Sequence, residues 1–223
     1  MADSSQVAVP AGPHQGQPVI YAGAPLHEAR AAMIMLHGRG STAADILTVA
    51  EHLGQPGFAF VAPEAADDAW YPLKYWAPLA ANEPWLSSAL LAVEELVYRI
   101  NEAGVPPERL MFLGFSQGAC ISLEFVVRRP RRYGGAVALS GALVGPPDTP
   151  RGYRGSLAGT PVLLGCGDRD EHFSIEAVDH ASEVMRRLGG DVTKRIYPNM
   201  GHVIHQDELE FVREMMAALL VPD

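Results

Sequence analysis

The chain alternates short apolar runs with amphipathic helical patterns along most of its 223 residues. Each run is long enough for one strand, and most of them carry few polar residues, which is typical of strands covered on both faces. These runs lie at residues 18–22, 31–36, 58–62, 110–115, 136–140, 161–166 and 192–197. About seven strands are therefore expected.

Helical patterns separate most of these runs. The clearest covers residues 85–103, where apolar residues recur at spacings of three and four. Similar stripes lie at 175–188 and 209–219, and Ser41 or Thr42 can cap another helix. The alternation predicts an α/β fold with a mostly parallel, twisted sheet and helices on both faces. Functional loops are then expected at the carboxyl ends of the strands.

Composition and charge exclude several classes of protein. Acidic residues outnumber basic ones by 26 to 17, and Lys74 and Lys194 are the only lysines, so no basic face for nucleic acid is expected. No run of about 18 apolar residues could span a membrane. Cys120 and Cys166 lie in apolar runs, and the first residues do not read as a secretory signal, which predicts a cytoplasmic protein.

The length favours a single domain, since domains commonly have about 150 residues. Residues 1–17 mix Pro, Gly, Ser and Gln without periodicity and are predicted to form a mobile tail. Residues 18–223 are predicted to form the one domain, in which 145–159 is a long surface connection.

The residues Gly114-Phe115-Ser116-Gln117-Gly118 match the pattern G-x-S-x-G. They follow an apolar run and precede a helix-like stretch, which is the setting of a nucleophile elbow. Flanking glycines lack the side chains that would clash with the strained serine there. We therefore expect Ser116 to be a nucleophile, with an ordinary glycine-containing turn as the alternative.

A serine nucleophile needs a base, and an acid behind that base. Among the downstream histidines, His202 follows the run 192–197 in a loop expected at the carboxyl edge of the sheet, and we predict it as the base. His180 is expected on the outer face of a helix and His205 at a helix start. No third ligand accompanies His202 and His205 at a spacing typical of zinc, so no metal site is predicted.

The acid is expected directly after the run 161–166. Asp168 and Asp170 both lie in the loop that follows, and spacing alone does not choose between them.

Backbone N–H groups must stabilise the oxyanion of the tetrahedral intermediate. One is predicted from Gln117, directly after the nucleophile. The other is predicted from Arg39, in the glycine-rich turn 37–40 that follows the run 31–36.

All three tryptophans fall within residues 70–85, in a stretch that prolines interrupt. Such a stretch after a strand can form the wall of a ligand cleft, although core packing of an irregular loop is the alternative. Trp70, Tyr71 and Trp76 are predicted to face the substrate.

Together these motifs resemble the small serine hydrolases of the carboxylesterase, lysophospholipase and acyl-protein thioesterase family, which have the α/β-hydrolase fold. The resemblance covers about residues 31–219. It rests on segments 36–40, 104–106, 109, 114–119, 138–140, 167–170 and 200–202.

The resemblance implies Ser116 as nucleophile, His202 as base, Asp170 rather than Asp168 as acid, and the amides of Arg39 and Gln117 as oxyanion donors. The sequence departs from the family pattern at two places, and both bear on substrate preference more than on the chemistry. Arg39 replaces an apolar residue that is frequent in that loop, and residues 171–173 replace an apolar segment that often ends in Pro.

We therefore predict a serine carboxylesterase that hydrolyses esters with a small to medium apolar acyl or aryl group through an acyl-enzyme. It would need no cofactor, and its partner would be a small-molecule ester; a homodimer is left open. An acyl thioesterase or lysophospholipase is the alternative within the same class. A non-catalytic binding module of the same fold is an alternative of another class.

Overall fold

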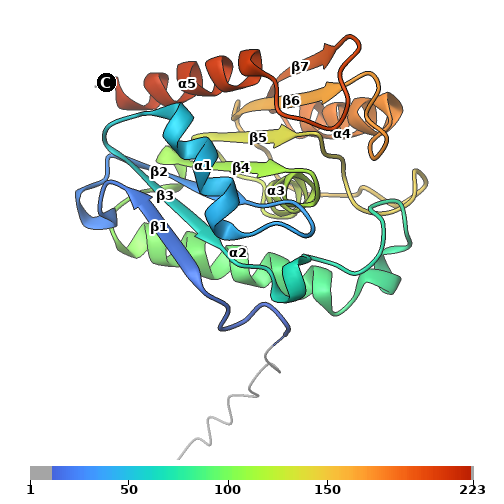
Figure 1. Ribbon diagram of the computed structural model, residues 1–223, viewed down its shortest axis with the longest axis horizontal. Helices are drawn as coiled ribbons and strands as arrows, with labels where there is room; N and C mark the ends of the chain where they lie inside the picture. Colours follow the sequence, from blue (N-terminus) through green and yellow to red (C-terminus); the bar gives the residue numbers. More distant parts are fainter. Residues whose placement is uncertain (1–11, 222–223) are drawn as a thin grey trace, which may run out of the picture.

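The computed structural model describes residues 12–221, which contain one seven-stranded sheet (Figure 1). The strand order is β1-β3-β2-β4-β5-β6-β7. β1 is antiparallel to β3 and every other neighbouring pair is parallel, so the prediction of a mostly parallel sheet is confirmed. The strands are β1 (Val19–Gly23), β2 (Ala31–Leu36), β3 (Phe58–Pro63), β4 (Leu110–Phe115), β5 (Gly135–Leu139), β6 (Pro161–Gly167) and β7 (Asp191–Tyr197).

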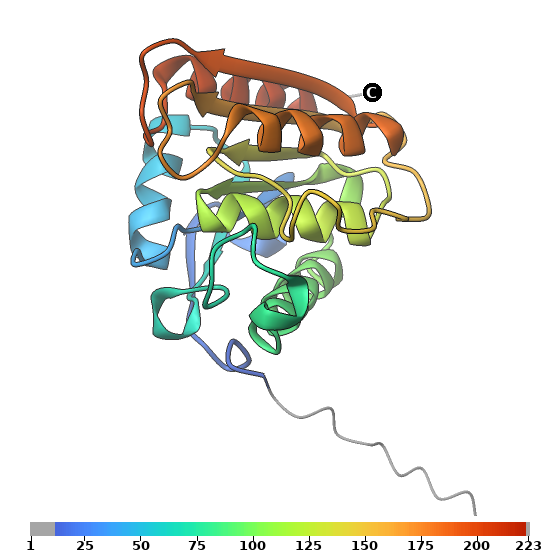
Figure 2. The same ribbon diagram turned by 90° about the vertical axis from the view of Figure 1, so that its right-hand side faces the viewer.

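Helices cover both faces of the sheet, as predicted. α1 and α5 pack on one face, and α2, α3 and α4 pack on the other (Figures 1 and 2). Thr42 caps α1 in a capping box with Asp45. The helices are α1 (Ala43–Leu53), α2 (Trp85–Glu102), α3 (Gln117–Arg128), α4 (Ile175–Arg187) and α5 (Gln206–Leu220), with short 3₁₀ helices η1 (Leu26–Glu28), η2 (Ala66–Asp68), η3 (Leu79–Asn82) and η4 (Pro107–Arg109).

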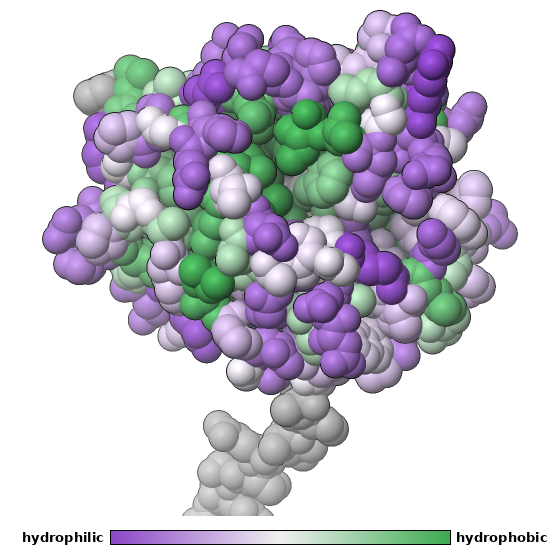
Figure 3. All heavy atoms as spheres, viewed as in Figure 1, coloured by the Kyte–Doolittle hydropathy of each residue, from purple (hydrophilic) through white to green (hydrophobic). Residues whose placement is uncertain are grey.

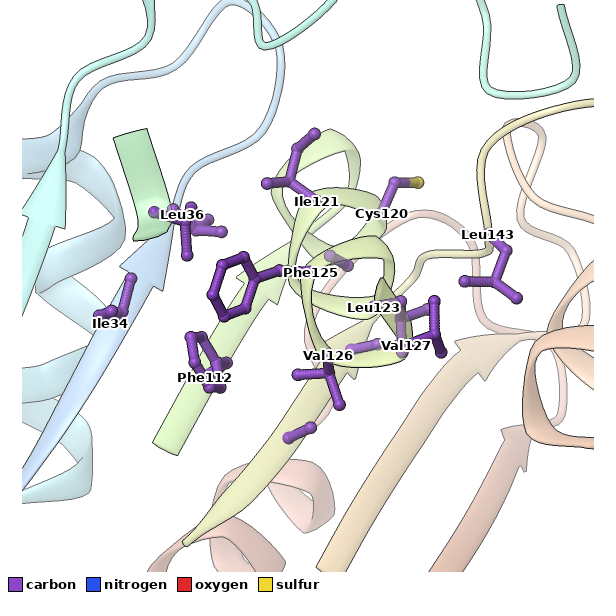
Figure 4. Close-up of a cluster of buried hydrophobic side chains, with 14 of the residues drawn as sticks. Ile34, Leu36, Phe112, Cys120, Ile121, Leu123, Phe125, Val126, Val127 and Leu143 are labelled. Atoms are coloured by element: carbon purple, nitrogen blue, oxygen red, sulfur yellow. The ribbon is translucent and has the colours of Figure 1, made fainter. Parts of the chain in front are cut away.

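The apolar runs are buried because side chains of a strand alternate between two cores. In β2, Ile34 belongs to the core beneath α2, α3 and α4, whereas Met33 belongs to the core beneath α1 and α5. In Figure 4, Phe125 of α3 lies over Phe112 of β4, and their ring centres are 5.2 Å apart. α3 is therefore held against the centre of the sheet.

The edge strands are less buried than the sequence suggests. β7 was expected from a buried apolar run, yet most of its residues are partly or fully exposed. β7 pairs only with β6, so one side of its ladder is open, and β1 is partly exposed for the same reason at the opposite edge.

The arrowheads of β4, β5, β6 and β7 point the same way in Figure 1, and Figure 2 views the molecule from that side. The connections after β3, β5, β6 and β7 emerge at this carboxyl edge. The segment 140–160 is one of these connections, and it contains residues 145–159, for which a long surface connection was predicted.

The first described residues do not behave as a tail. Residues 1–11 of the predicted tail lie outside the described residues, but 12–17 pack on the domain. His14 is buried; its Nε2 donates to the carbonyl of Trp70 (3.0 Å), and its Nδ1 accepts from the N–H of Ala66 (3.1 Å). The boundary at residue 17 is therefore wrong, because the buried His14 imidazole and the hydrogen bonds that His14 and Gln15 form with Ser88 anchor this segment.

Replacing His14 should destabilise the fold. His14→Ala leaves the Ala66 N–H and the Trp70 carbonyl buried without partners, so we expect the free energy of unfolding to fall by about 2–4 kcal/mol at pH 7.5. Urea unfolding measures this loss. His27→Ala, at an exposed histidine, is the control and should change it by less than about 0.5 kcal/mol.

The comparison of wild type with His14→Ala also tests how the free energy of unfolding depends on pH. Burial lowers the pKa of His14 below its ordinary 6.5, so the unfolded chain binds the proton more readily. Stability from the neutral imidazole is present above pH 6.5 and is lost as the pH falls towards the lower folded pKa. The difference between wild type and His14→Ala should therefore narrow at pH 5, and a constant difference would contradict this role.

Hydrophilic and hydrophobic residues are interspersed on the face seen in Figure 3. Among residues 12–221, no helix is both long enough and apolar enough to cross a membrane. Within this described range, the large apolar side chains that remain exposed are Ile20, Tyr21, Leu73, Trp76, Tyr98, Val203 and Val221.

Candidate active site

Ser116 lies at the sharp turn between β4 and α3 with a left-handed backbone (φ 56°, ψ −119°). A Cβ at Gly114 would lie 2.3 Å from the carbonyl carbon of Gly118, and a Cβ at Gly118 would lie 2.0 Å from the carbonyl oxygen of Leu36. Only glycine fits at either position, which explains the spacing of the G-x-S-x-G pattern. The turn is the strained elbow that the sequence predicts.

His202 and Asp170 are hydrogen-bonded. His202 Nδ1 lies 2.8 Å from Asp170 Oδ2, and the carboxylate side chain is completely buried. Asp170 Oδ1 also accepts from the N–H groups of His172 (2.8 Å) and Phe173 (3.1 Å). Burial alone would raise the pKa of Asp170, but these hydrogen bonds outweigh it and hold that pKa below its ordinary value. The ionised carboxylate therefore orients the imidazole with Nδ1 as donor and Nε2 free to accept.

The loop geometry distinguishes Asp170 from Asp168. Arg169 donates its N–H to the carbonyl of Met200 (2.9 Å), which ties the loop after β6 to the loop that carries His202. Asp168 is exposed, and its side chain makes no hydrogen bond among residues 12–221. The structure brings Asp170, and not Asp168, to the predicted base.

His202 also lies beside the elbow. Its ring centre is 4.8 Å from that of Phe115, the residue before Ser116. The hydrogen bonds of the described residues do not include one between Ser116 and His202. Such bonds are often long in a free enzyme and shorten when substrate binds.

The other downstream histidines have different surroundings. His205 caps α5 and accepts from the N–H of Asp207, as expected for a histidine at a helix start. His180 is not on the outer face of its helix: it is half-buried, because the connection 140–160 crosses that side of α4, and its Nε2 is buried. No group of three metal-ligating side chains occurs among residues 12–221.

Two backbone N–H groups at the elbow are free. Among residues 12–221, neither the N–H of Arg39 nor that of Gln117 has a hydrogen-bond acceptor. The two segments are adjacent, because a Cβ at Gly38 would lie 3.3 Å from the Cβ of Ser116. The residues predicted as oxyanion donors therefore present unpaired donors next to the serine.

A cavity of about 180 Å³ opens over Ser116. Of the three aromatic residues predicted to face the substrate, Tyr71 and Trp76 line this cavity, whereas Trp70 does not. Trp70 is fully buried, and its Nε1 donates to the carbonyl of His37 (2.8 Å), so its predicted contact with substrate is wrong. Core packing, the alternative interpretation, applies to this tryptophan. The complete lining consists of Arg39, Tyr71, Leu73, Lys74, Tyr75, Trp76, Ser116, Gln117, His172 and Phe173.

Several site residues were missed by sequence reasoning. Phe173 stacks on Tyr75 (ring centres 4.8 Å apart) and faces His202 at 5.9 Å, while His172 meets His202 edge-on at 4.7 Å. The position of His172 and Phe173 directly after Asp170 is a signal that could have found them. Tyr75 lies in the aromatic stretch 70–85 that was predicted to form the wall of a cleft, and this position is the signal that could have found it.

A mostly parallel sheet flanked by helices, with a serine at a left-handed elbow and a nearby His–Asp pair, defines an α/β-hydrolase. Comparisons with known proteins agree. The phospholipase/carboxylesterase family model matches residues 17–220. The chain therefore belongs to this family, and the predicted class, a hydrolase that acts on carboxylic esters, is confirmed.

Individual relatives support the same assignment. Acyl-protein thioesterase 1 of Saccharomyces cerevisiae is 29% identical over 208 residues, which cover 84% of this chain and 92% of the yeast protein. A probable carboxylesterase of Arabidopsis thaliana is 28% identical over 62% of this chain and 55% of its own length. The crystal structure of a phospholipase/carboxylesterase from Dyadobacter fermentans superposes with a TM-score of 0.88 and 37% identity over 93% of this chain and 99% of that one.

Proposed function

We propose that the protein hydrolyses carboxylic esters through an acyl-enzyme on Ser116, with His202 as the base and Asp170 as its orienting acid. The hydrogen bond from His202 Nδ1 to Asp170 Oδ2 carries this proposal. It fixes the imidazole in the tautomer that can accept a proton on Nε2, beside a serine held at a strained elbow.

The steps follow from these positions. Ser116 Oγ attacks the ester carbonyl carbon while its proton moves to His202 Nε2, and the N–H groups of Arg39 and Gln117 donate to the oxyanion. When the tetrahedral intermediate collapses, the bond to the leaving oxygen breaks and the alcohol takes the proton from His202. Water then attacks the acyl-enzyme with His202 again as the base, which releases the acid and restores the serine.

The lining of the cavity supports a small to medium acyl or aryl group. Its volume of about 180 Å³ is below the roughly 300–1,000 Å³ typical of sites for drug-sized ligands. The rings of Tyr71, Tyr75 and Phe173 supply flat apolar surface next to the serine.

Covalent labelling tests the mechanism. A fluorophosphonate should modify the purified protein at Ser116, and mass spectrometry of the peptide that contains it identifies the residue. Labelling should be lost in Ser116→Ala but kept in Ser87→Ala, whose serine is exposed in α2. A wild-type protein that resists labelling would favour a non-catalytic binding module instead.

A thioester or lysophospholipid substrate is the second candidate. The name of the yeast relative favours the thioester, and the exposed apolar side chains of Leu73 and Trp76 at the cavity favour a longer apolar group. Rates on matched series of short esters, acyl-CoA thioesters and lysolipids would rank the three classes. The primary proposal requires the highest kcat/KM on the short esters.

A cytoplasmic location is also part of the proposal. It is supported by two cysteines, Cys120 and Cys166, that are buried and unpaired, as is typical of a reducing compartment. The homodimer left open by the sequence stays a prediction.

A further inference from the structure

The backbone N–H of Arg39 lies next to Ser116, but its side chain binds another part of the cleft. Its Nη2 donates to the carbonyls of Tyr71 (2.6 Å) and Leu73 (2.7 Å), and its Nη1 donates to the carbonyl of Pro72 (3.0 Å). Within residues 12–221, Arg39 forms no ion pair with a carboxylate. One guanidinium therefore holds three consecutive carbonyls, which we call the wall segment (residues 71–73).

The side chain of Gln117 holds the same region. Its Oε1 accepts from the N–H of Trp70 (2.8 Å), and its Nε2 donates to the carbonyl of Tyr71 (2.7 Å). Arg39 and Gln117 are also the two residues whose free N–H groups lie next to Ser116. The residues that present the oxyanion donors thus use their side chains to bind the wall of the same cleft.

The wall segment depends on these bonds. Among the described residues, the carbonyls of Pro72 and Leu73 accept hydrogen bonds only from Arg39. Just before the segment, Asp67 and Asp68 both have left-handed backbones (φ 48° and 52°), which are unfavourable for residues with side chains. The chain that leads into the wall segment is therefore strained. Asn82 contributes a further hydrogen bond, because its Oδ1 accepts from the Leu73 N–H (2.9 Å).

We propose that the Arg39 guanidinium is a positioning residue that makes the wall segment a fixed wall instead of a movable lid, and thereby limits the length of the acyl group. Tyr71 and Leu73 line the cavity from this segment, so their position sets its size. The proposal extends the proposed ester hydrolysis and depends on it for its kinetic consequences.

The test compares Arg39→Leu and Arg39→Lys with wild type on p-nitrophenyl esters from acetate to dodecanoate. Leucine keeps apolar bulk but has no donor, and a single ammonium cannot span three carbonyls in the guanidinium geometry. In Arg39→Leu we expect kcat/KM on butyrate to fall about tenfold. A displaced wall segment would no longer hold the ester carbonyl in the geometry for attack by Ser116. The ratio of dodecanoate to butyrate should rise at least about fivefold as the wall becomes movable, with Arg39→Lys intermediate.

Arg132→Leu is the matched control. Arg132 also donates to consecutive backbone carbonyls, those of Ala158 and Gly159, but it lies before β5, at the amino edge of the sheet. Its loss removes the same kind of contact far from the cleft. The acyl-length profile of this variant should match wild type.

Amide hydrogen exchange supplies a readout that does not require turnover. Peptides covering residues 70–76 should exchange at least about tenfold faster in Arg39→Leu than in wild type or Arg132→Leu. If Arg39→Leu does not fold, Arg39→Lys carries the same comparison, with smaller changes in the same direction. Unchanged exchange would overturn the proposal, even if the rate fell, because Arg39 would then act on substrate directly.

Failure of the inference can be separated from failure of the proposed function. If Ser116→Ala keeps its activity, the mechanism is wrong whatever the exchange data show. If Ser116→Ala is inactive but the Arg39 variants keep the wild-type acyl-length profile and exchange, only the positioning role is wrong.

Discussion

Ser116→Ala is expected to lower kcat on p-nitrophenyl butyrate by roughly 10³- to 10⁶-fold, because no other group at the elbow can form the acyl-enzyme. The residual rate would come from binding and from the oxyanion donors, which the substitution leaves in place. Alanine removes only the hydroxyl, so the strained turn and the glycine contacts around it persist. Steady-state kinetics on purified protein measures the loss.

Two controls make this result interpretable. Thermal unfolding of Ser116→Ala should match wild type to within a few degrees, which excludes a folding defect. Ser87→Ala, at an exposed position of helix α2, should keep the wild-type rate. If the Ser116 variant retained a tenth of the wild-type kcat, another residue would have to be the nucleophile.

Asp170→Asn is expected to lower kcat by about 10³- to 10⁴-fold, while Asp168→Asn should change it by less than about threefold. An amide at residue 170 can donate to the imidazole, which favours the tautomer with its proton on Nε2 and blocks that nitrogen as an acceptor. Asp168 differs because its side chain is exposed. Its hydrogen bond is made by the backbone N–H, which donates to the carbonyl of Tyr197. Measuring both variants on one ester therefore isolates the acid.

The reverse ranking would contradict the assignment of the acid. A larger loss in Asp168→Asn would require the loop after β6 to rearrange when substrate binds. Equal losses would instead indicate a shared effect on that loop, and comparison of their thermal unfolding would reveal it.

Much of this site could be predicted because it depends on local patterns. The strand, glycine and serine order around Ser116 specifies a strained turn, since only glycine tolerates the approaching backbone at residues 114 and 118. His202 could be predicted in the same way, because a loop after a parallel strand must emerge at the carboxyl edge.

Other features could not be predicted from such patterns. Trp70 and Trp76 have the same chemistry and lie six positions apart, yet one is fully buried and the other is half-exposed and lines the cavity. His14 lies in a segment that is unremarkable by composition, and it is buried because the loop at residues 66–70 offers it a donor and an acceptor.

The sequence by itself determined the alternation of strands and helices, the elbow and the kinds of residue that could act there, because these depend on short-range periodicity and backbone sterics. Only the tertiary structure decided that Asp170 meets His202, that Trp70 is core, and that Arg39 binds the wall segment. Each of those outcomes joins residues that are about 30 or more positions apart. Hydrogen bonds at such separations depend on how the packed layers bring loops together, and no local pattern encodes that arrangement.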